Sequence, residues 1–306
     1  MGIWYVKQIK SAEEICKENK HKWAQKLVYL WKKTFGIVTL KEVGNKTIAL
    51  LPEGDLSKIA QKLCKKIYDR ENQNLVLSSE LMEQKSFVNY LYSNNCNILN
   101  GRWLFSYLIE EVLEYIGKKS ERPVETMEVS VMVNDNSEKN LKTIVDIALK
   151  VKMLNIITNH IETFMKLEEY LYNRHGILVR VTNNKKKSLL KTNVIVNLDF
   201  PEEIVNKYSL PKKGIIVNIG EEVHIRSRRF SGINVNFFEI DLPEEKFFRE
   251  NNLLGEFESA ILYESVLHRK GSYESIREQI KENKSNIKNL VGINGIICEK
   301  EYKDSQ

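Results

Sequence analysis

The sequence predicts an α/β protein with two domains, in which a smaller N-terminal α/β domain is followed by a doubly wound parallel sheet. Three observations predict this fold class. After Pro123, five short runs rich in valine and isoleucine alternate with amphipathic stretches of helical period. The runs are almost continuously apolar, which is typical of parallel strands that helices cover on both faces. The chain has 306 residues, of which 42% are hydrophobic, and it is long enough for two domains with cores of their own.

The N-terminal part alternates in the same way and ends in a linking helix. Strands are predicted at 3–9, 46–52 and 74–80, and helices at 12–35, 56–68 and 100–119. The helix at 12–35 carries Trp23 and Trp31 on one apolar stripe, which we expect to lie in the core; a dimer surface is the alternative. We place the first domain at residues 1–122, with the linking helix 100–119 included.

The second domain, residues 123–255, contains the five apolar runs. They predict strands at 129–135, 154–160, 177–184, 193–199 and 214–220, with helical stretches between them. Gly176 follows the second of these helices, where a glycine in the left-handed conformation commonly ends a helix. Past Gly220 the parallel pattern stops. Helices at 257–269 and 273–289 form a last segment, 256–300, which is predicted to return to the first domain.

Composition narrows the class of protein. No run approaches the ~18 apolar residues of a membrane span, and the first residues lack the pattern of a signal peptide, so we expect a cytoplasmic protein with no membrane partner. Cys16, Cys64, Cys96 and Cys298 form no CxxC pair, so we expect buried reduced thiols and neither a zinc site nor a disulfide framework. The net charge of +6 lies mostly on helix faces where lysine alternates with glutamate. Nucleic acid is therefore not an expected partner.

Polar residues end every predicted strand of the second domain. They are Asn134–Asp135, Asn159–His160, Asn183–Asn184, Asn197–Asp199 and Asn218–Glu221. The carboxyl ends of parallel strands share one edge of the sheet, where ligands bind, although Asn and Asp are also the commonest residues for leaving a strand. Asn197 and Asn218 fall within otherwise apolar strands, where an amide needs a partner. The pattern predicts a polar site lined by amides at this edge.

The order of elements and the segment EFESAILYESVLHRKGSYESIREQIKENKSNIKNLVGING, residues 256–295, resemble a known family. The chain is similar to the shikimate-dehydrogenase-like and amino-acid-dehydrogenase-like two-domain NAD(P)-binding proteins. The resemblance is architectural and covers about residues 100–295. It implies a Rossmann-like second domain and NAD or NADP as the cofactor.

The chain departs from that family at the turn after the first strand of the second domain. Such proteins have glycines there, because a side chain would keep the backbone away from the pyrophosphate. Here the turn is Asn134-Asp135-Asn136-Ser137-Glu138, which places two carboxylates where the phosphates would sit. We therefore do not expect pyrophosphate in the usual pose. The alternative role of the turn is to cap the next helix through Asn136 or Ser137.

The end of the second strand is more compatible with a nucleotide. The resemblance assigns Asn159 and His160 to the place where the family reads the adenine ribose, with His160 standing where some members carry an arginine. The alternative is that both are N-cap and turn residues. His160 is also the best candidate for a titrating group. The candidate cofactor-binding residues are Asn134, Asn136, Asn159, His160, Asn183, Asn197 and Asn218, with no metal ligand among them.

The sequence does not decide between enzyme and binding protein. No G-x-S-x-G, H-E-x-x-H or G-x-x-x-x-G-K-[ST] motif occurs, and Arg102 and Asp55, which could orient an anionic substrate, also suit a helix start and a turn. The favoured function is a degenerate NAD(P)-binding-type protein, a pseudoenzyme that binds a small-molecule ligand or a protein partner. The alternatives are an NAD(P)-dependent oxidoreductase with an atypical phosphate loop and, third, a sugar-nucleotide transferase. A homo-oligomer is compatible with each.

Overall fold

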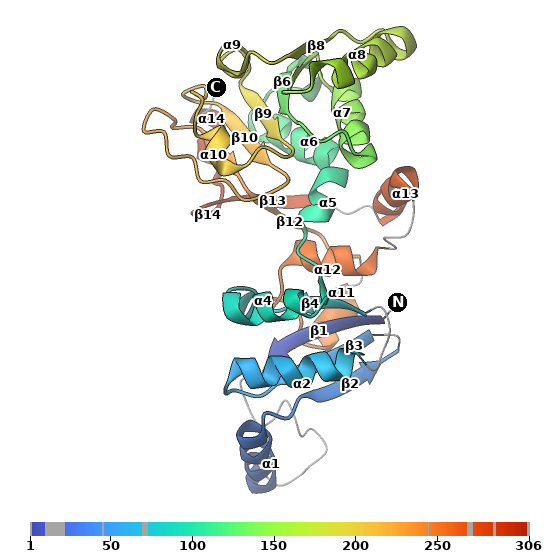
Figure 1. Cartoon of the computed structure of the whole chain (residues 1–306), viewed down its shortest axis with the longest axis vertical. Coiled ribbons are helices and arrows are strands. Elements are labelled where there is room, and N and C mark those ends of the chain that lie inside the picture. Colours follow the sequence, from blue (N-terminus) through green and yellow to red (C-terminus); the bar gives the residue numbers. More distant parts are fainter. Residues whose placement is uncertain are drawn as a thin grey trace. The chain divides into compact units, whose positions relative to one another are not determined.

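The computed structural model describes residues 2–9, 22–44, 46–68, 73–243, 245–267, 272–283 and 286–304. The chain forms two compact units (Figure 1). Unit 1 comprises Met1–Asn100 with Glu244–Val266, and unit 2 comprises Gly101–Pro243 with Leu267–Gln306. Each unit contains a largely parallel sheet with helices packed on it, so the predicted α/β class is confirmed.

Unit 1 is built on a five-stranded sheet in the order β2-β3-β1-β4-β5. The strands are β1 (Gly2–Gln8), β2 (Thr39–Val43), β3 (Lys46–Leu51), β4 (Gln73–Leu77) and β5 (Asn97–Ile98), and the helices are α1 (Lys22–Phe35), α2 (Leu56–Tyr68), α3 (Ser79–Met82), α4 (Lys85–Ser93), α11 (Glu245–Glu250) and α12 (Ser259–Val266). All neighbouring strands pair in parallel except β2, which runs antiparallel to β3. The core includes Trp4 of β1, Leu51 of β3, Leu63 of α2 and Phe87 of α4.

The helix α1 differs from the expectation for its tryptophans. Trp23 and Trp31 are 67% and 57% exposed, so the predicted core position is wrong for both side chains. The reason is that the polar side of α1 holds it to the unit: Lys32 donates to the hydroxyl of Thr39 at 2.9 Å, and Lys33 pairs with Glu53 at 2.7 Å. Residues 12–21 of the predicted helix lie outside the described residues.

Two of the described cysteines are buried, as expected, and one is not. The Sγ atoms of Cys64 and Cys96 lie 3.9 Å apart in the core of unit 1, and the contact with Cys96, together with burial, raises the pKa of the Cys64 thiol. Cys298 is exposed, because it lies in the surface connection directly before α14 (Glu299–Asp304). Cys16 lies outside the described residues.

Unit 2 contains a six-stranded sheet in the order β8-β7-β6-β9-β10-β11, with all strands parallel. The strands are β6 (Glu128–Met132), β7 (Met153–Ile157), β8 (Val179–Thr182), β9 (Val194–Asn197), β10 (Ile215–Asn218) and β11 (Ile233–Val235). Counted along the chain, this is the order 3-2-1-4-5-6 of the dinucleotide-binding fold that is called the Rossmann fold. The prediction of a Rossmann-like, doubly wound sheet is confirmed.

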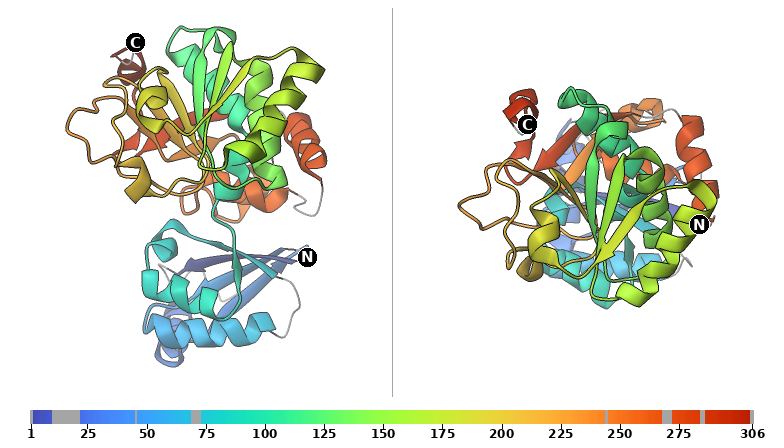
Figure 2. Two further views of the ribbon diagram at one scale, coloured as in Figure 1. Left: turned by 45° about the horizontal axis from the view of Figure 1, so that its top comes forward. Right: turned by 90° about the horizontal axis from the view of Figure 1, so that it is seen from above.

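Helices cover both faces of this sheet, as Figure 2 shows. The crossover helices are α7 (Glu138–Lys150), α8 (Ile161–His175), α9 (Lys185–Leu189) and α10 (Glu202–Val205). Successive strand residues alternate between the faces. Met132, Ile157 and Ile195 therefore share one face, where they join a core with Leu189 of α9 and Val205 of α10. Gly176 ends α8 with φ 66° and donates its N–H to the carbonyl of Tyr172 at 2.9 Å, as predicted.

Three elements of unit 2 differ from the sequence prediction. The linking helix 100–119 is two helices, α5 (Arg102–Tyr107) and α6 (Ile109–Lys119), which Leu108 separates with φ −102° and ψ 14°. Both belong to unit 2, whereas the sequence placed them in the first domain. The parallel pattern does not stop at Gly220, because β11 adds a sixth strand. This strand has three residues and no helix precedes it in its crossover, so its pattern is too short to stand out.

The helix predicted at 273–289 is the third difference. α13 (Tyr273–Asn283) is shorter, and β13 (Ile287–Gly292) pairs antiparallel with β12 (Phe237–Ile240) and β14 (Gly295–Ile296). β13 forms a strand because it pairs with β12, which lies some 50 residues away in the chain. Local periodicity cannot reveal such a pairing. Of the C-terminal helices, α12 belongs to unit 1, and α13 and α14 belong to unit 2.

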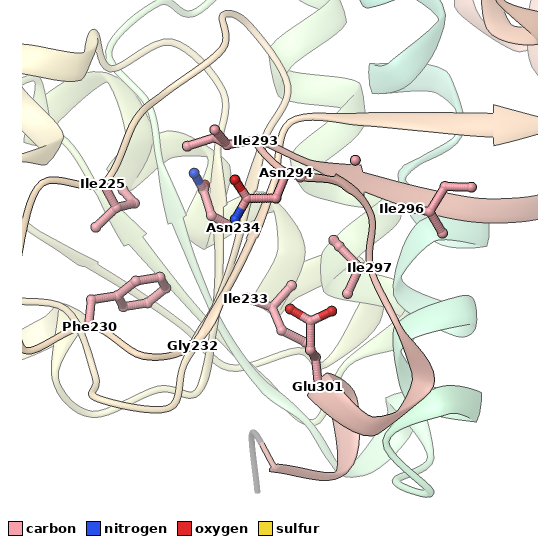
Figure 3. A pocket seen from close by; sticks show the side chains of 12 residues that line it. Ile225, Phe230, Gly232, Ile233, Asn234, Ile293, Asn294, Ile296, Ile297 and Glu301 are labelled. Carbon is pink, nitrogen blue, oxygen red and sulfur yellow. The ribbon is translucent and has the colours of Figure 1, made fainter.

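The hairpin β13–β14 and the loop before β11 border a pocket of about 200 Å³. Figure 3 shows Ile225 and Phe230 on one side of it and Ile296 and Ile297 on the other. At Gly232 a Cβ atom would lie 1.9 Å from the carbonyl oxygen of Gly214, so only glycine fits there. Among the described residues that form the pocket, none is a predicted site residue.

Within the described ranges, no helix has the length and apolar character that crossing a bilayer requires.

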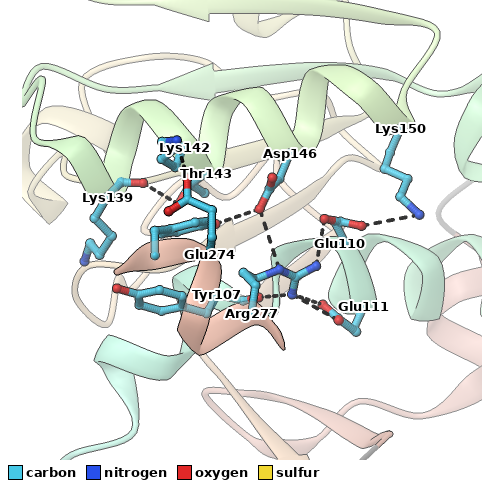
Figure 4. Close-up of polar contacts among 11 residues, drawn as sticks. Tyr107, Glu110, Glu111, Lys139, Lys142, Thr143, Asp146, Lys150, Glu274 and Arg277 are labelled. Atoms are coloured by element: carbon cyan, nitrogen blue, oxygen red, sulfur yellow. Dashed lines mark hydrogen bonds and ion pairs between the residues drawn. The ribbon is translucent and has the colours of Figure 1, made fainter. Parts of the chain in front are cut away.

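Arg277 of α13 ties together α5, α6 and α7 (Figure 4). Its side chain is buried and donates to the carbonyl of Tyr107, to both oxygens of Glu111 at 3.0 and 2.9 Å, and to Glu110 at 2.7 Å. Its Nε lies 3.8 Å from Oδ2 of Asp146. Burial raises the pKa of Glu111 and that of Asp146, so these carboxylates depend on the guanidinium for compensation.

We expect Arg277→Met to lower the free energy of unfolding by about 3–5 kcal/mol, because it removes the cation beside Glu111 and Asp146 and leaves Glu110 with Lys150 alone. Urea unfolding followed by circular dichroism measures this change. Arg174→Met, at the exposed end of α8, is the matched control and should leave the midpoint almost unchanged. Equal midpoints for the two variants would contradict the assigned role of Arg277.

Candidate functional site

The strand order creates a topological switch point between β6 and β9, which are neighbours although their crossovers leave toward opposite edges of the sheet. Ligands of this fold bind at the carboxyl ends of the strands at such a point. The residues gathered there come from the ends of β6, β7 and β9 and from the start of α9. We call Asn134, Asp135, Asn159, His160, Lys185 and Asp199 the switch-point site.

The carboxylate of Asp199, which follows β9, binds the turn that follows β6. The backbone N–H of Asn134 donates to both of its oxygens at 2.9 Å, and the N–H of Asp135 donates to Oδ2 at 2.6 Å. In the Rossmann fold, N–H groups of this turn and of the following helix start hold the pyrophosphate. Here a carboxylate of the protein itself accepts two of these N–H groups.

Asp135 fixes the start of α7. Its carboxylate accepts from the N–H of Ser137 at 3.3 Å and from the side-chain amide of Asn140 at 3.3 Å. Ser137 occupies the N-cap position, as one of the two predicted alternatives had it, but its side chain makes no capping hydrogen bond. Asn136 is exposed and lies outside the cap position. The conformation of the turn is thus held by two carboxylates, that of Asp135 within it and that of Asp199 after β9.

The charges of this site are partly desolvated. Burial raises the pKa of Asp199, and the nearby Asp135 adds to the rise, while the N–H groups of Asp135 and Asn134 and the proximity of His160 oppose it. Burial also lowers the pKa of Lys139, on the first turn of α7, against the effect of Asp135. The centre of the switch-point site therefore holds the carboxylates of Asp135 and Asp199 close together, and their charge disfavours the binding of an anionic ligand.

The ends of β7 and β8 complete the site. The side-chain oxygen of Asn134 accepts from the N–H of Asn159 at 2.9 Å, and the Lys185 ammonium donates to Oδ1 of Asn159. His160 is exposed at the N-cap position of α8, where its N–H donates to the hydroxyl of Thr158 at 3.0 Å. The structure thus brings together three of the predicted residues, Asn134, Asn159 and His160.

Lys185 and Asp199 belong to the site but are not among the predicted cofactor-binding residues. Lys185 is buried, its Nζ lies 5.7 Å from the centre of the Phe200 ring, and burial lowers the pKa of its ammonium. In the sequence it is the first residue of a lysine run, which suggests a solvated surface. Asp199 was visible only as one of several polar residues at strand ends.

The structure places Asn197 and Asn218 inside the sheet rather than on the surface of a cleft. Both are buried, and Nδ2 of Asn197 donates to Oδ1 of Asn218 at 3.2 Å. Asn218 in turn donates to the side-chain oxygens of Asn234 and Asn236 at 2.8 and 3.0 Å, and Asn236 binds the backbone of Val223. These amides are used within the protein, where they hold the strand ends and the loop at 219–223.

The remaining candidates lie apart from the switch-point site. Asn183 is exposed after β8, and its carbonyl accepts the N–H of Lys185 at 2.9 Å. Arg102 donates to the carbonyl of Asn218 at 3.2 Å and lies over the Phe237 ring. Asp55 accepts from the N–H groups of Ser57 and Lys58 and thereby caps α2, which is the structural role considered for it. Among the described residues, no group of three or more His, Cys, Asp and Glu side chains is arranged to hold a metal ion.

Comparison with known proteins adds little to the strand order. No protein-family model matches the chain, and no curated protein matches it. Among solved structures, the Δ1-pyrroline-2-carboxylate reductase of Thermococcus litoralis, in complex with NADH and L-proline, is 7% identical with a TM-score of 0.27, and the match covers 40% of this chain and 40% of the reductase.

Two longer matches are similarly distant. The L-tryptophan dehydrogenase of Nostoc punctiforme is 10% identical with a TM-score of 0.28, over 92% of this chain and 87% of that protein. The ornithine transcarbamoylase of Giardia lamblia is 9% identical with a TM-score of 0.33, over 85% and 84%. Similarities at this level carry no argument about activity. The shikimate-dehydrogenase-like resemblance therefore stays a prediction, while the Rossmann-like fold follows from the sheet itself.

We expect Asn218→Ala to lower the free energy of unfolding by about 2–4 kcal/mol, because it removes a buried amide that several polar groups share. Urea unfolding measures the loss. Asn183→Ala, at the same edge but exposed, should change the value by less than about 0.5 kcal/mol. A loss of similar size in both variants would argue against the network.

The raised pKa of Asp199 predicts how its contribution to stability depends on pH. A carboxyl group whose pKa is higher in the folded than in the unfolded protein binds its proton more tightly when folded, so it stabilises the fold increasingly as pH falls through the folded pKa. The stability of the wild-type protein relative to Asp199→Asn should therefore rise from neutral pH toward about pH 4, the ordinary range of aspartate. Urea midpoints of both proteins at several pH values test this, and a constant or falling difference would contradict it.

Proposed function

We propose that this protein is a Rossmann-fold binding protein whose switch-point site takes a polar small molecule or a protein group and does not hold a dinucleotide by its pyrophosphate. One observation carries the proposal: the Asp199 carboxylate accepts the backbone N–H groups of Asn134 and Asp135. In this fold those groups are the ones that receive phosphate oxygens. A pyrophosphate would have to displace Asp199 and lie beside Asp135.

The other residues of the site suit a neutral or cationic ligand group. Asp135 and His160 are exposed at this edge, and Asn159 is exposed between them and Lys185. Carboxylate and amide oxygens accept hydrogen bonds from amines, amides and hydroxyls, which is the chemistry of an uncharged or positively charged polar ligand. No described arrangement in the site has the paired nucleophile and base of an acyl- or phosphoryl-transfer enzyme, which favours binding over catalysis.

Titration with NAD, NADH, NADP and NADPH tests this proposal through the thermal midpoint. A ligand at about 100 times its Kd stabilises a folded protein by about 2.7 kcal/mol, which such a titration readily detects. We expect no saturable rise for the wild-type protein with any of the four. In Asp199→Asn, which frees the N–H groups of the turn from an anion, NADH binding should become detectable or at least about tenfold tighter.

His160→Ala separates the proposal from the oxidoreductase alternative. A saturable rise in the wild-type protein that disappears in this variant would mean a working dinucleotide site and would overturn the proposal. Asn183→Ala, an exposed residue at the same edge, serves as the matched control. It should behave like the wild-type protein under either outcome.

A further inference from the structure

The helix α1 of unit 1 carries a continuous apolar stripe at its surface. The stripe consists of Trp23, Leu27, Leu30, Trp31 and Phe35, which recur at the spacing of one helix face. Each of these five side chains is more than half exposed, from 54% for Phe35 to 67% for Trp23. The rings of Trp31 and Phe35 lie 5.7 Å apart, so the stripe is one patch. An apolar patch of this kind on a helix marks an interaction surface.

The two helices at the stripe are basic. α1 and the neighbouring α2 contain four lysines each and no aspartate or glutamate. The lysines of α2, which are Lys58, Lys62, Lys65 and Lys66, are exposed, because its opposite face packs into the core. Lys62 donates to the carbonyl of Phe35, so α2 adjoins the end of the stripe. Among the described residues, Glu53 and Asp55, between β3 and α2, pair with Lys33 and Lys58 and offset part of this charge.

We propose that α1 lies in the interface of an anionic lipid surface, with the stripe inserted among the acyl chains and Lys26 and the exposed lysines of α2 at the head groups. Basic helices with tryptophan, phenylalanine and leucine on one face bind membranes in this way, and their binding strengthens with buried apolar area and with anionic lipid. Tryptophan prefers the depth of the head groups. The inference concerns a different surface from the switch-point site and does not depend on the function proposed for it.

The absence of acidic residues on α1 argues against a second copy of this chain as the occupant. Pairing two such helices along their stripes would bring the lysines of one close to those of the other without any carboxylate on either helix. The stripe also carries no polar side chain that would fix the register of a protein partner. A lipid surface needs neither register nor a complementary shape.

Co-sedimentation of the full chain with vesicles tests the inference. Vesicles of equal parts phosphatidylcholine and phosphatidylglycerol should bind the protein at low salt, and vesicles of phosphatidylcholine alone should bind it at least about tenfold more weakly. High salt should release it. The tryptophan emission should shift to the blue on binding, because Trp23 and Trp31 are exposed whereas Trp4 is already buried.

Two pairs of variants distinguish membrane binding through α1 from non-specific binding of the protein to vesicles. Lys26→Glu and the double variant Trp23→Ser, Trp31→Ser should each weaken binding by about tenfold. Lys166→Glu and Tyr172→Ser, which change exposed residues of α8 in unit 2, should not. All four changes affect exposed residues, and circular dichroism checks that the fold is kept.

Four results would overturn the inference. Equal binding to both kinds of vesicle, or binding that the α1 variants leave unchanged, would exclude an anionic surface recognised by this helix. A concentration-dependent dimer without lipid that Leu27→Glu dissociates would assign the stripe to a second copy. Binding to polyglutamate with no binding to the anionic vesicles would assign it to an acidic protein partner.

Discussion

The contact between Asp199 and the turn after β6 is the constraint on which the functional edge of unit 2 depends. Backbone N–H groups of a partly buried turn have no partner in a strand or a helix and need an acceptor. Asp199 supplies it from the neighbouring strand β9, across the switch point. The turn can therefore keep its conformation with side chains in place of glycines. The same contact removes the donors that would otherwise receive a phosphate.

Buried amides perform the corresponding task on the other half of the sheet. Asn197 and Asn218 end neighbouring strands, and their side chains, with those of Asn234 and Asn236, bind one another and the loop at 219–223. A buried polar network of this kind is favourable only when its members are satisfied, and it then fixes one arrangement of the strands. Both halves of the edge are thus held by protein groups, and Asp135, Asn159 and His160 are the exposed residues of the switch-point site.

Sequence reasoning reached the architecture because near-continuous apolar strands and helical periods are local signals. Among the described residues, it found five of the six strands in the parallel sheet of unit 2 and three of the five strands of unit 1. β11 and β13 were missed, since a short strand is defined by its partner and not by its own pattern. The polar strand ends also pointed to the edge of the sheet that carries the topological switch point. The sequence could not distinguish Asn197, whose amide is buried and hydrogen-bonded within the protein, from Asn159, which is exposed. Both are asparagines at the end of an apolar strand.

The net charge of the chain also does not show how its charges are distributed in space. The net charge is +6, and in the sequence lysine alternates with glutamate along predicted helices. In the structure the signs are separated: α1 and α2 carry only lysines, while Asp135 and Asp199 meet at the switch point. Electrostatic attraction depends on the local field, which falls off over about 10 Å at moderate salt, and not on the total charge. One protein can therefore present a surface that favours anions and a site that disfavours them, and each must be judged from its own residues.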